Sequence, residues 1–194
     1  MIVMSQSIEQ NNRIHPHKFT LWVAMAGIVM MFAGLTSAYI VKKSASNWLE
    51  FPLPTLFLIS TVLVVVSSIT IQLALKHFKE SNRLLFKNLI IVTSVLGILF
   101  IIVQVMAFLS LKQNGVQFFG QGSNASASFL GVIAGIHVLH VLGGIIALFF
   151  LLIKTFSKKT KIYNSVPIEI VSTYWHFVGA LWIYLYIFLY WVSN

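Results

Sequence analysis

Residues 174–190 read YWHFVGALWIYLYIFLY, and this stretch decides the fold class. It contains no formally charged side chain, and Gly179 is its one residue that disfavours a helix. The whole chain has the same character, because 58% of its 194 residues are hydrophobic and only 9% are charged. Soluble domains have about 25% charged residues. We therefore expect an all-α integral membrane protein, built as one helical bundle without a soluble domain.

A polar seam precedes this apolar stretch. Glu169, one of four acidic residues in the chain, lies seven positions before His176. On an α-helix that separation returns almost to the same face, and Ser172 and Thr173 lie between the two on that face. A charge at the bilayer centre costs about 2.5–3.5 kcal/mol. We therefore expect the seam to face protein, water or lipid headgroups, with Trp191 at a membrane interface.

Five apolar runs are long enough to span about 30 Å of hydrocarbon. We expect a polar tail over residues 1–18, without a cleavable signal peptide, and a single transmembrane domain over residues 19–194. Within it the predicted helices are 19–41, 52–75, 88–111, 128–153 and 167–192. Small residues in the first helix, among them Gly27 and Gly34, favour close packing between helices. Proline at position 54 suits the first turn of the second helix.

The distribution of Lys and Arg predicts the orientation. The tail and the second and fourth connections carry ten of these residues, and the other two connections carry three. The positive-inside rule therefore places the amino terminus inside and the carboxy terminus outside. The formal charge of +9 is explained by these connections, so we do not expect nucleic-acid binding. The chain has no cysteine, which excludes disulfides and thiolate metal sites.

Few polar residues lie inside the apolar runs. Gln104 is expected to hydrogen-bond to a neighbouring helix, with a functional contact as the alternative. His137 and His140 are three positions apart on one helix, so they cannot be opposite axial ligands of one haem. A haem between either of them and His176 is geometrically allowed, although the chain offers few other metal ligands. We favour hydrogen bonding between helices and contact with lipid headgroups.

Several segments resemble subunit III of the haem-copper terminal oxidases. The last helix of that family has a Glu seven residues before the His of a Trp-His-Phe-Val motif, and Glu169, Trp175 and His176 match it. Three other helices of the family are similar to GIHVLHVLGG (135–144), LWVAMAGIVMMFAGLTSAYIV (21–41) and STVLVVVSSIT (60–70). Gly97, Phe100 and Gln104 fit the remaining helix. The resemblance extends from Leu21 to Trp191 in the family's order and is to its five-helix bacterial form.

The resemblance implies a non-catalytic role in a cytochrome c oxidase of the bacterial cytoplasmic membrane. Such a subunit binds no haem or copper, which belong to partner subunits. It packs on subunit I, joins a complex with subunit II, and retains phospholipids in a cleft. The residues expected to serve structure or lipid contact are Glu169, His176, His137, His140, Gln104 and Trp175.

Three carboxylates of the family pattern are absent from this chain. Ile28, Ala107 and Gly179 stand at their positions. Roles that rest on those carboxylates therefore do not carry over. Alternatives within the family are a quinol oxidase subunit and a subunit III-like protein of nitric oxide reductases. Alternatives outside it are a stand-alone membrane haem protein and a small transporter, although no broken helix surrounds a polar site at the membrane midplane.

Overall fold

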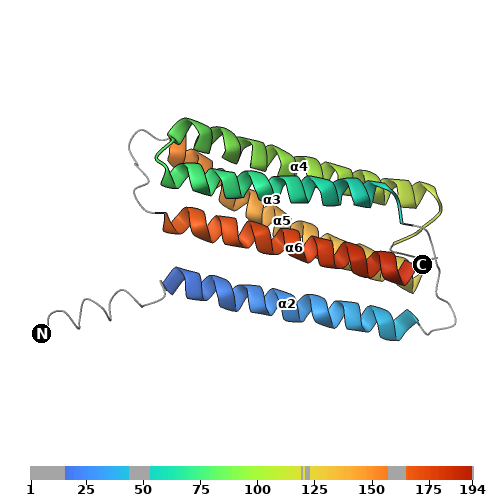
Figure 1. Cartoon of the computed structure of the whole chain (residues 1–194). Helices are drawn as coiled ribbons and strands as arrows, with labels where there is room; N and C mark the ends of the chain where they lie inside the picture. Colours follow the sequence, from blue (N-terminus) through green and yellow to red (C-terminus); the bar gives the residue numbers. More distant parts are fainter. Residues whose placement is uncertain (1–15, 44–52, 119, 121–122, 157–164, 194) are drawn as a thin grey trace, which may run out of the picture.

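The computed structural model describes residues 16–43, 53–118, 120, 123–156 and 165–193, and these residues form a bundle of five long helices (Figure 1). All five are long and apolar enough to cross a membrane. Their bounds are α2 Pro16–Lys43, α3 Leu56–Lys79, α4 Arg83–Gln113, α5 Ala125–Phe156 and α6 Val166–Ser193. The five predicted helices therefore exist in the predicted order, whereas residues 1–15 of the expected tail lie outside the described part.

The second helix differs most from its predicted bounds. It begins at Leu56, so Pro54 lies before the first turn and contributes its carbonyl oxygen to the Phe57 N–H at 3.1 Å. It continues past the apolar run to Lys79, and α4 begins at Arg83, so most of the expected loop is helical. Basic side chains near a helix C-terminus interact favourably with the helix dipole, and this helps the polar turn to remain helical.

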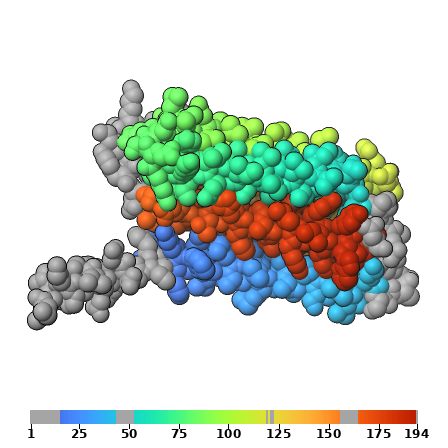
Figure 2. Space-filling view, in the orientation of Figure 1, coloured from blue at the N-terminus to red at the C-terminus, as the bar shows by residue number. Residues whose placement is uncertain are grey.

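Four of the helices form a ring. Within the described residues, α3 packs against α4 and α6, and α5 packs against the same two helices. The diagonal pairs α3–α5 and α4–α6 make no close backbone contact among these residues. The fifth helix, α2, lies outside the ring against α5 and α6 (Figure 1). Consequently α6 is exposed between α2 and α3 on one face of the molecule (Figure 2).

Close packing inside the ring depends on glycines of α4 and α5. A Cβ at Gly97 would lie 2.6 Å from the Trp175 side chain, and one at Gly144 would lie 3.0 Å from it. The glycines of α2 behave differently, because a Cβ at Gly27 or Gly34 would have no neighbour within 4 Å among the described residues. The close approach expected from these small residues is therefore not made within the described bundle.

The two ends of the bundle differ in charge. Lys18, Lys79 and Arg83 belong to one end, where α2 begins and where α3 and α4 meet. At the opposite end, Lys43 Nζ donates to the Val192 carbonyl at 2.7 Å and joins α2 to α6. The first turn of α2 and the last turn of α6 also lie at opposite ends of the bundle (Figure 1). Trp191 is 70% exposed in the last turn of α6, where an interfacial aromatic is expected.

Candidate functional site

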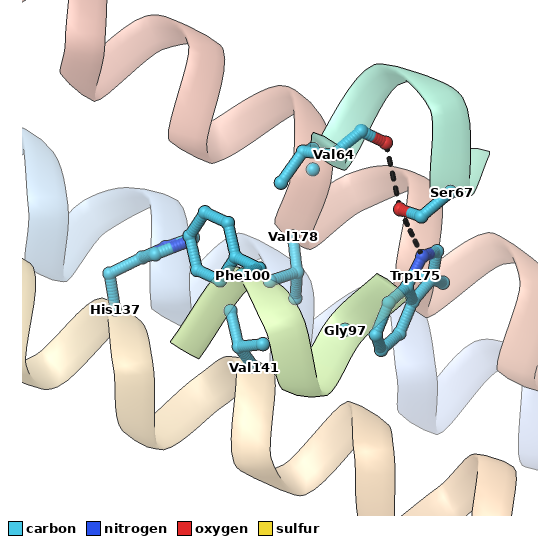
Figure 3. A pocket seen from close by; sticks show the side chains of 9 residues that line it. Val64, Ser67, Gly97, Phe100, His137, Val141, Trp175 and Val178 are labelled. Carbon is cyan, nitrogen blue, oxygen red and sulfur yellow. Dashed lines mark hydrogen bonds between the residues drawn. The ribbon is translucent and has the colours of Figure 1, made fainter. Parts of the chain in front are cut away.

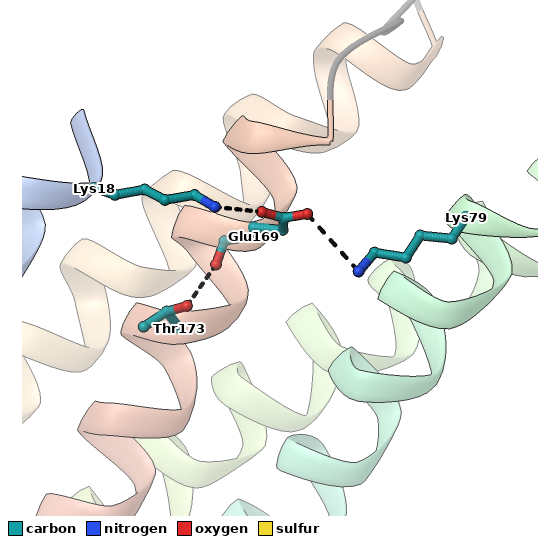
Figure 4. Close-up of polar contacts among 4 residues, drawn as sticks. All are labelled: Lys18, Lys79, Glu169 and Thr173. Carbon is teal, nitrogen blue, oxygen red and sulfur yellow. Dashed lines mark hydrogen bonds and ion pairs between the residues drawn. The ribbon is translucent and has the colours of Figure 1, made fainter. Parts of the chain in front are cut away.

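Glu169 joins three helices at the end of the bundle where α6 begins (Figure 4). Its Oε2 accepts a hydrogen bond from Lys18 Nζ of α2 at 2.7 Å, and its Oε1 lies 3.8 Å from Lys79 Nζ of α3. The side chain of Glu169 is 23% exposed, so the ion pairs are only partly solvated. Two lysines and one glutamate leave this cluster with one excess positive charge.

His176 lies two turns further along α6 and contacts α3. Its Nδ1 is hydrogen-bonded to the Ser68 hydroxyl, and its Nε2 is 3.1 Å from the Gln72 Oε1. Since an amide oxygen only accepts, Nε2 carries the proton and Nδ1 accepts from Ser68. The polar face predicted from residues 169 and 176 is therefore assembled, with its partners supplied by α2 and α3.

A polar pocket of about 300 Å³ lies over this face of α6. It is bounded by Lys18 and Trp22 of α2, by Gln72 of α3, and by Glu169 and His176 of α6. Ser172 and Thr173, which were predicted to share the seam, also line it. The pocket combines cationic, anionic and hydrogen-bonding groups with the apolar surface of the helices.

An apolar pocket of about 400 Å³ follows along the same two helices. Its walls include Val29 and Ala33 of α2 and Ala180 of α6. Tyr184 also lines it, and its hydroxyl is 3.1 Å from the Thr36 hydroxyl, which tethers α6 to α2. Both pockets are therefore lined by residues of α2 and α6.

His140 and His137 differ in their surroundings although both lie on α5. His140 is half-buried, and its Nδ1 donates to the Ile136 carbonyl at 2.8 Å. His137 is completely buried, and its ring lies 5.1 Å from that of Trp182. The cavity beside His137 has a volume of about 20 Å³, which is too small for a porphyrin. The alternative of a haem between α5 and α6 therefore does not fit at His137.

Trp175 packs in the interior of the four-helix ring. It is 7% exposed, and its Nε1 donates to the Ser67 hydroxyl of α3 at 3.1 Å. Its indole ring fills the space that Gly97 and Gly144 leave open. This side chain therefore connects α6 with three other helices and has a structural place in the bundle.

Gln104 forms the interhelical bond expected for it. Its Nε2 donates to the Ser60 hydroxyl of α3 at 2.9 Å, and the residue is 1% exposed. Its Oε1 has no hydrogen-bond partner among the described residues. The side chain thus gains one bond and leaves one buried acceptor unsatisfied.

Gln104→Leu is expected to leave the thermal stability of the purified complex unchanged or slightly higher. The lost interhelical bond is worth about 0.6 kcal/mol in a membrane protein, whereas an unpaired buried polar atom costs about 1–3 kcal/mol. The measurements are the thermal midpoint and the oxygen-consumption rate of the complex. A lower rate at unchanged stability would instead show the functional contact that was the alternative for Gln104.

Several partners in this site were missed by the sequence interpretation. Lys18, Lys79, Ser68 and Gln72 meet Glu169 or His176 only through packing between helices far apart in the chain. The spacing of residues within α6 predicts that this helix has a polar face. It contains no information on which other helices cover that face. Lys18 was assigned to the polar tail, yet it belongs to the first turn of α2.

The fold and the site together indicate the class of protein to which the chain belongs. Five helices are long and apolar enough to cross a membrane, several of their buried polar side chains hydrogen-bond across helices, and no group of three metal-ligating side chains occurs in the described part of the chain. Five apolar helices of this length are those of a multi-pass membrane protein. A sequence model of the family described as cytochrome c oxidase subunit III matches residues 19–194. The chain belongs to this family and is a subunit III of the haem-copper oxidases.

Individual relatives agree with this assignment. The chain is 29% identical to the probable cytochrome c oxidase subunit 3 of Nocardia farcinica, over 97% of this chain and 94% of that protein. It is 27% identical to cytochrome c oxidase subunit 3 of Bacillus sp. PS3, over 87% and 82% of the two chains. It is also 27% identical to the probable quinol oxidase subunit 3 of Staphylococcus saprophyticus, over 91% and 89%.

Proposed function

We propose that this chain is a non-catalytic subunit of a cytochrome c oxidase and that it retains phospholipid in the groove between α2 and α6. Oxygen reduction and proton translocation belong to partner subunits that hold the haems and copper. The chain packs on subunit I in a complex that also contains subunit II. The observation that carries the lipid proposal is the polar pocket of about 300 Å³ followed by an apolar pocket of about 400 Å³.

The two pockets lie on one side of the helix pair. Trp22 of the polar pocket and Val29 of the apolar pocket are seven residues apart on α2, which is almost two helical turns. Thr173 and Ala180 have the same separation on α6. Residues seven apart share a helix face, so the pockets follow one another along a continuous groove. This order matches the headgroup and acyl chains of a phospholipid.

The charges of the polar pocket favour a phosphate group. A lipid ammonium group would need a free oxygen of the Glu169 carboxylate, but both oxygens already face the amines of Lys18 and Lys79. Lys18 also lines the pocket, and the local excess of one positive charge attracts an anion. We therefore assign the lipid phosphate to the side of Lys18.

The charged ends support the predicted orientation in the bacterial cytoplasmic membrane. The end that holds Lys18, Lys79 and Arg83 is the more basic of the two among the described residues. The positive-inside rule places this end in the cytoplasm, which gives an internal amino terminus and an external carboxy terminus. The lipid headgroup then belongs to the inner leaflet, where anionic lipids favour basic segments.

Lys18→Met tests the lipid site. Removal of this cation is expected to lower the phospholipid content of the purified complex by about one molecule per complex, since the phosphate loses its nearest charge. Glu169→Gln is expected to retain that lipid, because both lysines stay. Phospholipid is measured by mass spectrometry and phosphorus analysis after mild detergent extraction.

Lys42→Met is the matched control, because Lys42 lies in the last turn of α2 at the other end of the bundle. Lipid loss in Glu169→Gln but not in Lys18→Met would show that Glu169 holds an ammonium group instead. Unchanged lipid content and complex stability in both variants would contradict a lipid role for this pocket.

A further inference from the structure

Ser172 is a buried serine whose hydroxyl has no hydrogen-bond partner among the described residues, and it is 2% exposed. Every other buried serine or threonine in the described part of the chain forms a hydrogen bond. Ser67, for example, donates to the Val64 carbonyl at 2.8 Å and accepts from Trp175 Nε1 at 3.1 Å (Figure 3). Since buried polar groups are nearly always paired, the partner of Ser172 is expected from outside this chain.

The position of Ser172 shows where that partner binds. The residue lies on α6 between Glu169 and His176, and all three line the polar pocket of about 300 Å³. A hydroxyl in a helix can instead donate to the carbonyl one turn before it, as that of Thr173 does to Glu169 at 2.8 Å. Ser172 makes no such bond among the described residues, so its hydroxyl is available to a ligand in the pocket.

Gln72 of α3 offers a second donor in the same pocket. Its Oε1 accepts from His176 Nε2 at 3.1 Å, and Ser68 holds the other nitrogen of that imidazole. These two bonds orient the amide of Gln72, so its Nε2 carries two hydrogens that have no partner among the described residues. The side chain is exposed and lines the pocket. Hydrocarbon offers no acceptor to such a group, so a polar part of a ligand is required.

The two donors lie below the level of the expected phosphate. Glu169 marks that level, and Ser172 and His176 follow it by three and seven residues on α6. At a rise of about 1.5 Å per residue they are roughly 4.5 and 10 Å deeper. The polar layer of one leaflet is about 5–8 Å thick, and the apolar pocket with Ala180 lies one turn beyond His176. The donors are therefore placed between the phosphate and the acyl chains, where a diacyl lipid has its ester carbonyls.

We propose that the lipid in this pocket is an ester-linked diacyl phospholipid, and that its ester carbonyls accept hydrogen bonds from the Ser172 hydroxyl and the Gln72 amide. This inference rests on the proposed function, because it requires a lipid with its phosphate beside Lys18. A carbonyl oxygen only accepts, so it matches two unpaired donors. An ether-linked lipid with the same headgroup and chains has no carbonyl and leaves both donors unpaired.

Competition between these two kinds of lipid tests the contact. The purified oxidase complex is equilibrated with vesicles of equal parts diacyl and dialkyl ether phosphatidylglycerol with matched chains, and bound lipid is counted by mass spectrometry. The molecule that the Lys18→Met complex lacks is the occupant of the pocket. The ester form should exceed the ether form at this position by about fivefold or more, since the ether form leaves buried donors unpaired.

The double variant Ser172→Ala and Gln72→Met removes both donors and should bring this ratio close to one. Thr173→Val is the matched control, because Thr173 lines the same pocket but its hydroxyl is already bonded to the Glu169 carbonyl. The control should keep the ester preference of the unmodified complex. If the double variant does not assemble, the ratio in the unmodified complex decides alone.

The possible results separate this inference from the proposed function. Equal binding of the ester and ether lipids by the unmodified complex would overturn the ester contact and leave the lipid site in place. An ester preference that persists in the double variant would also overturn it, since other donors would then be responsible. If the unmodified and Lys18→Met complexes hold the same amount of lipid, the proposed lipid site is wrong, and the ester contact is wrong with it.

Discussion

Replacement of Trp182 by alanine is expected to give the largest loss of stability in this chain. Trp182 is 0% exposed, its ring stacks on that of Phe57 at 5.9 Å, and its Nε1 donates to the Thr61 hydroxyl at 3.1 Å. Its indole also contacts the rings of Phe100 and His137. Truncation leaves a large cavity between helices and costs about 3 kcal/mol or more.

The loss should appear as a lower thermal midpoint and as less of this chain in the purified oxidase. Trp182→Phe retains most of the ring contacts and should cost less than the alanine variant. Trp191→Ala is the matched control, because that indole is 70% exposed at the end of the same helix. Equal losses for positions 182 and 191 would contradict a packing role specific to the interior.

Gly97→Ala is expected to destabilise the chain by about 1–3 kcal/mol through overpacking. The new Cβ would lie 2.6 Å from Trp175 Cη2 and 3.2 Å from Ile145 Cγ1. Ile145 belongs to α5, which packs on α4, and Trp175 reaches α4 from the diagonal helix α6, so the strain pushes α4 away from both side chains. The readout is again the thermal midpoint and the amount of chain retained in the complex.

A second substitution can relieve this strain. Trp175→Phe removes the ring atom nearest to the new Cβ, so the double variant should recover part of the loss, and the two effects should not add. Gly27→Ala is the control, because a Cβ there meets no atom within 4 Å among the described residues. Additive effects at positions 97 and 175 would show that the clash is not the cause.

Hydrophobic length predicted the number, order and approximate position of the helices. The prediction was least accurate at the polar ends, where α3 continues through Lys76 to Lys79. An apolar run reports where a helix crosses hydrocarbon, whereas a helix extends as far as its backbone hydrogen bonds and dipole partners permit. The absence of a family aspartate at Gly179 also has a packing explanation, because a Cβ there would lie 3.0 Å from Val64 Cγ1.

The candidate site, like the fold, could be predicted from the sequence only in part. Spacing within one helix correctly grouped Glu169 with His176, because residues seven apart share a face whatever surrounds the helix. The partners of that face could not be derived, since Lys18 and Ser68 reach it from helices more than 100 residues away in the chain. The buried position of His137 without a hydrogen-bond partner among the described residues could not be predicted either, because the position of a histidine in the helical pattern does not show whether its neighbours on other helices are polar or aromatic.

Local features of the amino-acid sequence are enough to predict a bundle of five membrane-spanning helices that belongs to the subunit III family. Helix length and apolar content follow from local composition, and the family motifs are local as well. Packing between the helices, in contrast, places α2 outside a four-helix ring, brings Gly97 and Gly144 against Trp175, and forms the pockets along α2 and α6 and inside the ring. These features depend on side-chain shape at contacts between distant helices, where a single Cβ decides whether two helices can meet.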